Sequence, residues 1–409
     1  MNHQYDVVIV GAGHAGVNLA ANLTKGNFGG SVALLSGETS LPYKRPPLSK
    51  GYLLGTESVD NLPLRSACYW ADSAVELMYD GKVCHVDPNR RVVRTEAGRE
   101  ITYDQLVWAT GGSARSLPTP GADRQGVHQI RTKQDADRLK AEVSQARRSV
   151  IVGGGYIGLE TAAAFRGLGL DVTVVEAGAR VLERVTSSVV SDYFLRVHRD
   201  AGVDLRLGTT VAEFRGRGTR LESVVLSDGT EIAAELAVIG VGMQPNIEVL
   251  AAAGAACSNG VDIDQWCRTS IDGVSAIGDC TSQLHPYSRG RRVRLESVHN
   301  ASEQAKVVAS DLTGKPAPNV EVPWFWSDQY SVKLKSAGIS TGYDTLITRG
   351  DSDGDSFTVL YLADGELIAI DCVNRPTDFA HGRALIKNNA RIHHRDSADP
   401  ECPLQLAVC

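Results

Sequence analysis

Apolar runs that end in glycine clusters dominate the hydrophobic pattern of this chain. Residues 5–10 form a short, β-branched, nearly continuous apolar run of the kind found in a buried parallel strand. The run leads into Gly11, Gly13 and Gly16 of a GxGxxG sequence, and a helix-compatible stretch follows over 17–23. Such glycines permit a tight turn, close approach of the backbone to a pyrophosphate and close helix–strand packing. The pattern therefore predicts a dinucleotide-binding strand–loop–helix unit.

The same pattern recurs later in the chain. An apolar run over 149–152 leads into a second GxGxxG sequence, and a helix over 159–168 and a strand over 171–175 are predicted after it. The residues assigned to this second loop are Gly153, Gly155, Tyr156, Ile157 and Gly158. A glycine-rich turn used only for packing does not explain two complete copies. The sequence therefore predicts two bound dinucleotides, and the natural pair is FAD and a nicotinamide.

An acidic residue closes each copy at the end of its second strand. The strand over 31–36 ends beside Gly37 and Glu38, where a carboxylate is expected to meet an adenosine ribose hydroxyl. Glu176 closes the second copy and is expected to accept from a free 2′-hydroxyl and to repel a 2′-phosphate, which favours NADH over NADPH. The basic residues nearby that would soften this preference are Arg180 and Arg184.

Several other segments are predicted strands, and some of them would end at the carboxyl edge of a parallel sheet, where ligands bind. Residues 83–93 resemble a hairpin with a Pro-Asn turn, and the runs 104–112, 237–246 and 273–280 are predicted buried strands that end in small residues. Asp279 in the last of these would face the ligand crevice and bond a ribityl hydroxyl. In isolation, however, a Gly-Asp pair after a strand is only a turn.

Composition narrows the class of protein. The chain has 409 residues, of which 43% are hydrophobic, enough for two or three globular domains. Its formal charge of −6 argues against general nucleic-acid binding, and no apolar run approaches a membrane span. A cytoplasmic protein is expected, since the N-terminus lacks a signal-peptide pattern.

The eight cysteines are scattered, and no two stand at CxxC spacing. This argues against a zinc ribbon, a sequence-local iron–sulfur site and a thioredoxin-like dithiol, and no metal site is expected. We expect reduced, mostly buried thiols. Any redox chemistry must then come from a bound cofactor.

Four short motifs occur in the order typical of one superfamily: GxGxxG from residue 11, ATG at 109–111, GxGxxG from 153 and AIGDC at 276–280. The chain resembles the two-dinucleotide flavoprotein reductases of glutathione-reductase type. Within that group, the segments 41–50, 294–301 and 323–330 look like those of the NADH-dependent ferredoxin reductases that serve bacterial cytochrome P450 and Rieske oxygenase systems.

The resemblance implies a set of cofactor contacts. Those to FAD would come from Gly11, Gly13, Ala15, Gly16, Gly37 or Glu38, Arg45, Lys50, Val83, Ala109, Thr110, Gly111, Arg131, Asp279, Ser297 and Val298. Those to NADH would come from the second glycine loop, Glu176 and Gly242. Because the residue directly after the second FAD strand is Gly37, it stays open whether Gly37 or Glu38 contacts the ribose.

The resemblance also implies the catalytic residues and the route of the electrons. Lys50 and Glu160 would pair beside the flavin and hold the reacting rings in register; the alternative is that each is a solvated surface charge. Trp326 would lie over the nicotinamide, although tryptophan is more often ordinary core. A helix over 297–312 would aim its N-terminal dipole at the flavin. A hydride would pass from NADH to the flavin, and two single electrons would then leave.

A missing cysteine pair favours a one-electron acceptor. Disulfide reductases of this superfamily carry CxxxxC soon after the first glycine loop, whereas residues 38–55 hold no cysteine. The expected partner is an acidic [2Fe-2S] ferredoxin, and the chain is expected to be a monomer or weak homodimer. The arginines that form either a docking patch or a solvated loop are Arg289, Arg291, Arg292 and Arg294. Alternative functions are an NADH oxidase, a quinone or dye reductase, and a redox-sensing flavoprotein partner.

The predicted fold class is α/β, with two Rossmann-like dinucleotide-binding domains and a smaller C-terminal α+β domain. An FAD domain is expected over 1–113 and 246–322, an NAD domain over 114–245, and the C-terminal domain over 323–409. Within the last domain, residues 357–373 read as strand, turn, strand. The tail over 393–409 lacks periodicity and is expected to be loosely held.

Overall fold

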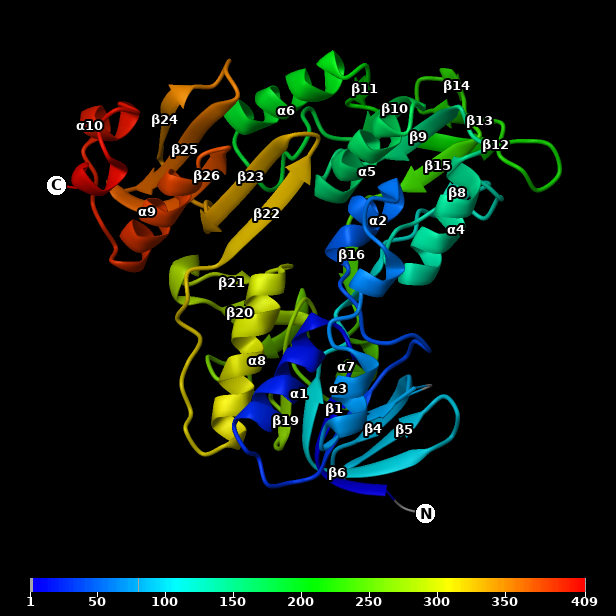
Figure 1. Ribbon diagram of the computed structural model, residues 1–409, viewed down its shortest axis with the longest axis vertical. Helices are drawn as coiled ribbons and strands as arrows, with labels where there is room; N and C mark the ends of the chain where they lie inside the picture. The colour runs from blue at the N-terminus through cyan, green and yellow to red at the C-terminus, as the bar shows by residue number, and fades with distance from the viewer. Residues whose placement is uncertain (1–2, 80, 409) are drawn as a thin grey trace. The chain divides into compact units, whose positions relative to one another are not determined.

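The chain forms two compact units in the computed structural model, which describes residues 3–79 and 81–408 (Figure 1). Expectations that touch residues 1, 2, 80 and 409 lie outside the described residues. Unit 1 comprises Met1–Lys44, Leu62–Ser113 and Gln244–Phe325. Unit 2 comprises Arg45–Asn61, Ala114–Met243 and Trp326–Cys409. This division into two units does not test the three domain boundaries inferred from the sequence, which stay a prediction.

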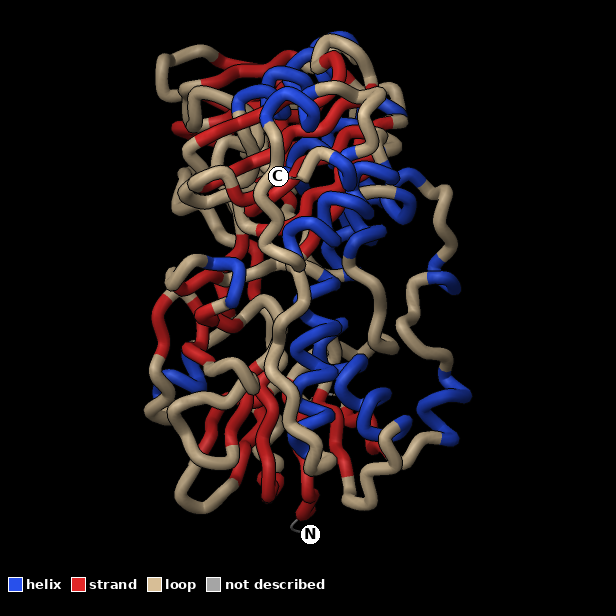
Figure 2. The backbone as a smooth tube through the Cα atoms, turned by 90° about the vertical axis from the view of Figure 1, so that its left-hand side faces the viewer, coloured by secondary structure: helices blue, strands red, loops and turns tan. Residues whose placement is uncertain are grey.

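A seven-stranded sheet forms the centre of unit 1, in the order β3-β2-β1-β6-β5-β4 with β19 also paired to β6. Its strands are β1 (His3–Val10), β2 (Val32–Leu35), β3 (Val75–Met78), β4 (Val83–Asp87), β5 (Val92–Thr95), β6 (Glu100–Trp108) and β19 (Val274–Ala276). The pairs β1–β2, β1–β6 and β6–β19 are parallel, whereas β4 and β5 form the predicted antiparallel hairpin. Figure 2 shows these strands in red above the N-terminal label. The predicted buried strand at 5–10 is confirmed, since Val7, Val8 and Ile9 are fully buried.

Two helices of unit 1 pack together beside this sheet. They are α1 (His14–Lys25), which follows the first glycine loop, and α8 (Val298–Leu312) (Figure 1). The helix predicted over 297–312 is thereby confirmed. Unit 1 also contains α3 (Ala67–Asp72), α7 (Glu248–Ala252) and the sheet β17 (Cys257–Ser258), β18 (Gly260–Ile263), β20 (Thr281–Leu284) and β21 (Arg292–Val293).

Unit 2 contains a parallel five-stranded sheet in the order β11-β10-β9-β15-β8. Its strands are β8 (Val127–His128), β9 (Arg148–Val152), β10 (Asp171–Glu176), β11 (Asp204–Leu207) and β15 (Leu236–Ile239). The helices of this part are α2 (Gly51–Leu54), α4 (Lys133–Val143), α5 (Tyr156–Gly167) and α6 (Ser188–Asp200), and an antiparallel sheet joins β12 (Val211–Arg215), β13 (Ser223–Leu226) and β14 (Glu231–Ala233). The second predicted strand–loop–helix–strand copy is confirmed as β9, α5 and β10.

One predicted strand is divided in the structure. The run 237–246 forms β15 and then β16 (Met243–Pro245), which pairs with β7 (Gly112–Ala114) instead of with the parallel sheet. Gly242 separates the two strands with φ +108°, a conformation that side-chain-bearing residues rarely adopt. The apolar pattern alone does not show this change of direction.

The C-terminal part of unit 2 is a five-stranded sheet in the order β22-β23-β26-β25-β24, with α9 (Pro376–Lys387) packed on it. Its strands are β22 (Trp324–Gln329), β23 (Val332–Gly338), β24 (Thr345–Asp351), β25 (Ser356–Ala363) and β26 (Glu366–Val373). The predicted strand, turn, strand is confirmed by β25 and β26. Their two-residue turn has Asp364 at φ +53° and Gly365 at φ +81°, as a tight hairpin turn requires.

The C-terminal tail is packed, so the expectation of a loosely held segment is wrong for its described part. It contains α10 (His394–Ala398), and Leu404 and Ala407 are fully buried. Arg349, which is 2% exposed, donates to the carbonyl oxygens of Ser397 at 3.3 Å and Cys402 at 2.8 Å, and also to that of Asp399. A buried arginine thus holds a segment in which the sequence shows no periodicity.

No helix in the described part of the chain is both long enough and apolar enough to cross a membrane.

Candidate dinucleotide and hydride-transfer site

The outer glycines of each loop are required by the fold. Gly11 and Gly153 have φ values of +111° and +109°, where an L side chain is strained. A Cβ on Gly16 would lie 2.0 Å from the carbonyl oxygen of Gly11, and a Cβ on Gly158 would lie 2.0 Å from that of Gly153. The two loops therefore share the same turn and the same close helix–strand packing.

The fold does not require glycine at the middle position of either loop. Gly13 and Gly155 adopt extended backbone with φ −81°, and a Cβ on either residue would meet nothing within 4 Å. Each is the N-cap of its helix and makes no side-chain cap hydrogen bond, so open space lies beside the glycine at the start of α1 and of α5. Open space at a helix N-terminus suits a phosphate. These residues therefore fit the pyrophosphate of a dinucleotide in both loops.

Glu38 and Glu176 each lie at or just after the end of the second strand of their copy, as predicted, but they accept hydrogen bonds from different kinds of donor. Glu38 accepts a hydrogen bond from the Tyr43 hydroxyl at 2.6 Å. Glu176 accepts from the backbone N–H of Gly154 at 2.5 Å and of Gly178 at 2.7 Å, so its carboxylate lies against the second loop. Arg180 donates hydrogen bonds to two backbone carbonyl oxygens and to the Ser191 hydroxyl, so its guanidinium is bound within the protein.

Lys50 and Glu160 form an ion pair in unit 2, with Nζ 2.8 Å from Oε2. Lys50 follows the 3₁₀ helix η1 (Pro46–Ser49), while Glu160 lies in the first turns of α5 and is only 4% exposed. Two hydroxyls complete the site, because Ser49 donates to Oε2 at 2.9 Å and Ser327 donates to Oε1 at 2.6 Å. Neither charge is a solvated surface charge. Their role beside a flavin stays a prediction.

Burial raises the pKa of Glu160 above its ordinary value, while the Lys50 ammonium and the hydroxyls of Ser327 and Ser49 oppose the rise. A buried carboxylate is tolerated only with such partners. The sequence analysis gave no role to Ser49 or Ser327. The only available signal was that each adjoins a predicted site residue, Lys50 or Trp326.

Other predicted site residues of unit 1 lie beside the first glycine loop or at the ends of strands and helices of that unit. A Cβ on Gly278 would lie 3.0 Å from the Cβ of Ala15, which places Asp279 beside that loop. The segment before Val83 lies against the end of β2, since the amide of Gly81 donates to the carbonyl of Ser36 at 2.8 Å. The residues 109–111 directly follow β6. Ser297 caps α8 by accepting from the Asn300 amide at 3.0 Å.

In unit 2, Arg45 donates to the carbonyl oxygen of Arg131 at 2.6 Å, which brings these two predicted residues together. Ile157, directly after Tyr156 in the second loop, is 45% exposed although it is a large apolar residue. Trp326 is partly exposed and precedes Ser327 on β22, so its side chain points to the opposite face from the hydroxyl that binds Glu160. Its contact with a nicotinamide stays a prediction.

The arginine cluster is smaller than the sequence indicates. Arg294 is only 11% exposed and pairs with Glu296 at 2.5 Å, so including it in an exposed patch is wrong. Arg289, Arg291 and Arg292 remain exposed. Arg292 also donates to the carbonyl of Ser282 at 3.0 Å.

The thiols are less buried than expected. Among the described cysteines, all free, Cys267, Cys280 and Cys372 are buried, whereas Cys68 and Cys84 are exposed, so the expectation of mostly buried thiols is wrong. Burial raises the pKa of the Cys280 thiol to about 11, which makes it a poor nucleophile. No group of three potential metal ligands occurs in residues 3–79 and 81–408.

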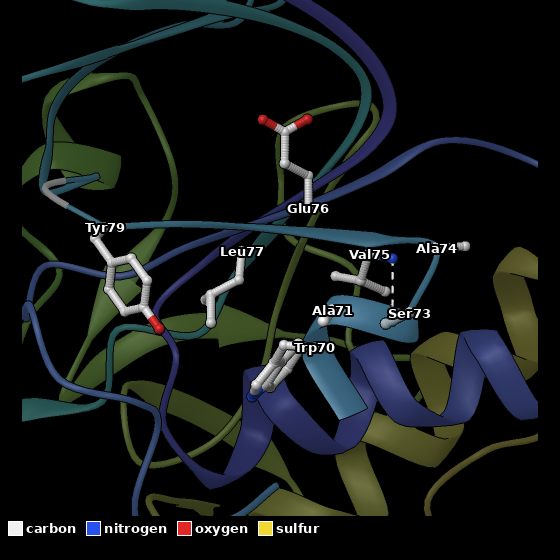
Figure 3. A pocket seen from close by; sticks show the side chains of 8 residues that line it. All are labelled: Trp70, Ala71, Ser73, Ala74, Val75, Glu76, Leu77 and Tyr79. Carbon is white, nitrogen blue, oxygen red and sulfur yellow. Dashed lines mark hydrogen bonds between the residues drawn. The ribbon is translucent and has the colours of Figure 1, made fainter. Parts of the chain in front are cut away.

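A surface hollow of about 470 Å³ lies away from these residues. It is formed at β3 and the end of α3, and Trp70, Glu76 and Tyr79 line it (Figure 3). Glu76 there accepts from the Tyr5 hydroxyl at 2.6 Å. The hollow contains none of the predicted site residues.

Two matching glycine loops, with a buried Glu160 on the second helix paired to Lys50, are the features expected of a two-dinucleotide oxidoreductase. The chain belongs to the pyridine nucleotide-disulphide oxidoreductase family, whose model matches residues 5–305, and a reductase C-terminal domain matches 324–408. The fold expected from the sequence is thereby confirmed.

Relatives match over nearly the full length of the chain. The 5,5′-dehydrodivanillate O-demethylase ferredoxin reductase subunit of Sphingobium sp. is 44% identical over 98% of both chains. The ferredoxin reductase for the CYP199A2 system from Rhodopseudomonas palustris has 38% identity and a TM-score of 0.95, covering 99% of this chain and 100% of that one. A covalent putidaredoxin reductase–putidaredoxin complex gives the same identity and TM-score, with coverage of 99% and 97%.

Proposed function

We propose that the chain is an FAD-dependent ferredoxin reductase that takes a hydride from NADH and passes electrons singly to a [2Fe-2S] ferredoxin of a cytochrome P450 or Rieske-type oxygenase system. The observation that carries this proposal is the pair of matching glycine loops, of which only the second has on its helix a buried carboxylate, Glu160, paired with Lys50. When bound, FAD supplies a two-electron acceptor for the hydride and a one-electron donor for an iron–sulfur cluster.

Unit 1 would hold the flavin nucleotide. The open space at Gly13 receives the pyrophosphate, and Gly37 or Glu38 meets the adenosine ribose. Asp279, beside Ala15, accepts from a ribityl hydroxyl. The N-terminus of α8, which Ser297 caps, supplies positive potential for a flavin that gains negative charge on reduction.

Unit 2 would hold NADH. The pyrophosphate lies over Gly155, and Glu176 accepts from the 2′-hydroxyl of the ribose. A 2′-phosphate there would face a carboxylate that two backbone amides already fix against the loop. This argument supports NADH over NADPH.

The Lys50–Glu160 pair would orient the reacting rings. Serine hydroxyls hold both carboxylate oxygens, so Glu160 fixes where the ammonium of Lys50 points. A fixed charge costs no reorganisation during hydride transfer. Trp326 on the adjoining strand is proposed to cover the nicotinamide.

The electron acceptor is proposed from two facts. Residues 38–55 contain no cysteine, so the thiol relay implied by the family's name has no cysteine pair after the first loop. Several relatives are named as ferredoxin reductases. An acidic ferredoxin would dock on the exposed arginines Arg289, Arg291 and Arg292, whose charges would mainly accelerate association.

The test is NADH-driven cytochrome c reduction with and without an added [2Fe-2S] ferredoxin. We expect turnover of about tens per second with ferredoxin and slow NADH consumption without it. The rival function is an NADH oxidase or quinone reductase, which would consume NADH rapidly with oxygen or a quinone alone. That result would replace the proposed function.

A further inference from the structure

A line of hydrogen bonds runs from Glu160 to the surface through the interior of unit 2. Ser327 Oγ donates to Glu160 Oε1 at 2.6 Å, and Gln329 Nε2 donates to Ser327 Oγ at 3.2 Å. Gln329 Oε1 lies 2.8 Å from His198 Nε2, and His198 Nδ1 lies 3.3 Å from the Tyr330 hydroxyl. The three middle residues are at most 1% exposed, whereas Tyr330 is 40% exposed.

The direction of each hydrogen bond follows from the carboxylate. A carboxylate only accepts, so the single hydroxyl hydrogen of Ser327 is used on Glu160. Ser327 must then accept from the amide nitrogen of Gln329, which turns the Gln329 carbonyl oxygen toward His198. His198 therefore carries its proton on Nε2, and its bare Nδ1 accepts from Tyr330. Every donor in the line points toward Glu160.

The outer end of the line is built into a strained turn. Tyr330 is the first of two residues between β22 and β23, and its φ is +54°, a region that bulky residues avoid. Its ring packs on the His198 ring with centroids 5.1 Å apart. Such strain persists only where surrounding contacts support it.

We propose that His198 is a positioning residue that acts through Gln329 and Ser327 to fix the Glu160 carboxylate, and with it the ammonium of Lys50. Aligned hydrogen bonds polarise one another, so the line strengthens the final bond to Glu160. Gln329 interrupts any proton wire, because an amide cannot pass a proton on without changing its bonding. The line therefore orients the ion pair and does not conduct protons. This inference rests on the proposed role of Lys50 and Glu160.

The kinetic test uses the flavin-loaded protein and stopped-flow reduction by NADH. His198→Phe keeps a ring but leaves the Gln329 oxygen without its donor, so we expect the rate at saturating NADH to fall about tenfold. The Kd for NADH should stay within about twofold. His198→Gln, which keeps a donor near the position of Nε2, should restore most of the rate.

Tyr193→Phe is the matched control. Tyr193 is a buried aromatic residue on the same helix, and its hydroxyl contacts Asp355 at 3.4 Å, outside the line. An unchanged rate in His198→Phe, or an equal loss in Tyr193→Phe, would overturn the proposal.

A second readout needs no activity. Nitrogen-15 NMR of the full-length protein should show His198 neutral with its proton on Nε2, and Ser327→Ala, which cuts the line, should mix the two tautomers. Wild-type His198 protonated on Nδ1 would refute the inference. If NADH fails to reduce the flavin, the proposed function falls, while the tautomer still decides the orientation of the line.

Discussion

The two glycine loops share one backbone but differ in the side chain two residues after the last glycine. In the first loop this residue is Asn18, which donates to the Ser302 hydroxyl of α8 at 2.9 Å and joins two helices. In the second loop it is Glu160, which binds Lys50 and two serines. The repeat thus supplies the same loop geometry twice, and one position distinguishes the loop whose helix also carries a buried charge.

The largest effect expected on function separates the two glycine loops by the dinucleotide that each is proposed to bind. Gly13→Val should fold, since its new Cβ meets nothing within 4 Å, yet its side chain would fill the space of the pyrophosphate and weaken FAD binding about a hundredfold. The equivalent Gly155→Val should keep the flavin and lose reduction by NADH. Flavin absorbance per chain after purification measures flavin retention in both variants, and its bleaching on addition of NADH measures reduction.

Gly16→Ala is the control for this experiment, because its Cβ would lie 2.0 Å from a backbone oxygen and should damage the fold itself. A Gly13→Val protein with a full complement of flavin would show that the first loop is not the FAD cradle.

The next effect tests the charge that distinguishes the second loop. Lys50→Met leaves the Glu160 carboxylate buried without its cation and should destabilise unit 2 by about 4 kcal/mol. Adding Glu160→Gln should recover most of this loss. Asn18→Ala, at the matching position of the first loop, should cost only about 1 kcal/mol. Denaturant unfolding measures all three, and equal costs for Lys50→Met and Asn18→Ala would contradict a buried charge at Glu160.

Acid should destabilise unit 1 through a buried histidine. Burial lowers the pKa of His285 from its ordinary 6.5 to about 4. Below pH 6.5 the histidine becomes protonated in the unfolded chain, whereas in the folded chain it stays neutral until about pH 4. The free energy of unfolding is therefore unaffected above pH 6.5 and is lower by about 2 kcal/mol at pH 5.

His285→Gln should remove this part of the pH dependence, while His394→Gln, at an exposed position, should leave it unchanged. Thermal unfolding at pH 7 and pH 5 makes the comparison. An identical pH dependence in wild type and His285→Gln would exclude His285 as the cause.

The smallest effect concerns nucleotide choice. Glu176→Gln removes the charge opposite a 2′-phosphate and should lower the preference for NADH over NADPH about tenfold, or about 1.4 kcal/mol. Glu38→Gln makes the matching change at the first loop and should leave the preference unaltered. The measurement is the ratio of kcat/KM for NADH to kcat/KM for NADPH in each protein. If the wild-type protein used both nucleotides with the same kcat/KM, Glu176 would not have the role given to it.

Local patterns predicted most of the fold. Both strand–loop–helix copies, the 83–93 hairpin and the helix over 298–312 follow from apolar periodicity and turn residues close in sequence. Contacts between distant segments were not predictable. His198 meets Gln329 across 131 residues, and Arg349 binds the tail through backbone carbonyls, which carry no sequence signal. The site shows the same limit, since Lys50 and Glu160 were found by resemblance while Ser49 and Ser327 had no motif of their own.

An anaerobic titration of the purified protein tests the central claim most directly. The account predicts one flavin per chain, bleached by about one NADH and recoloured by about two equivalents of oxidised [2Fe-2S] ferredoxin, because a hydride carries two electrons and each cluster takes one. A flavin that NADH leaves oxidised, or a reduced flavin that ferredoxin cannot recolour while oxygen or a quinone does, would contradict it.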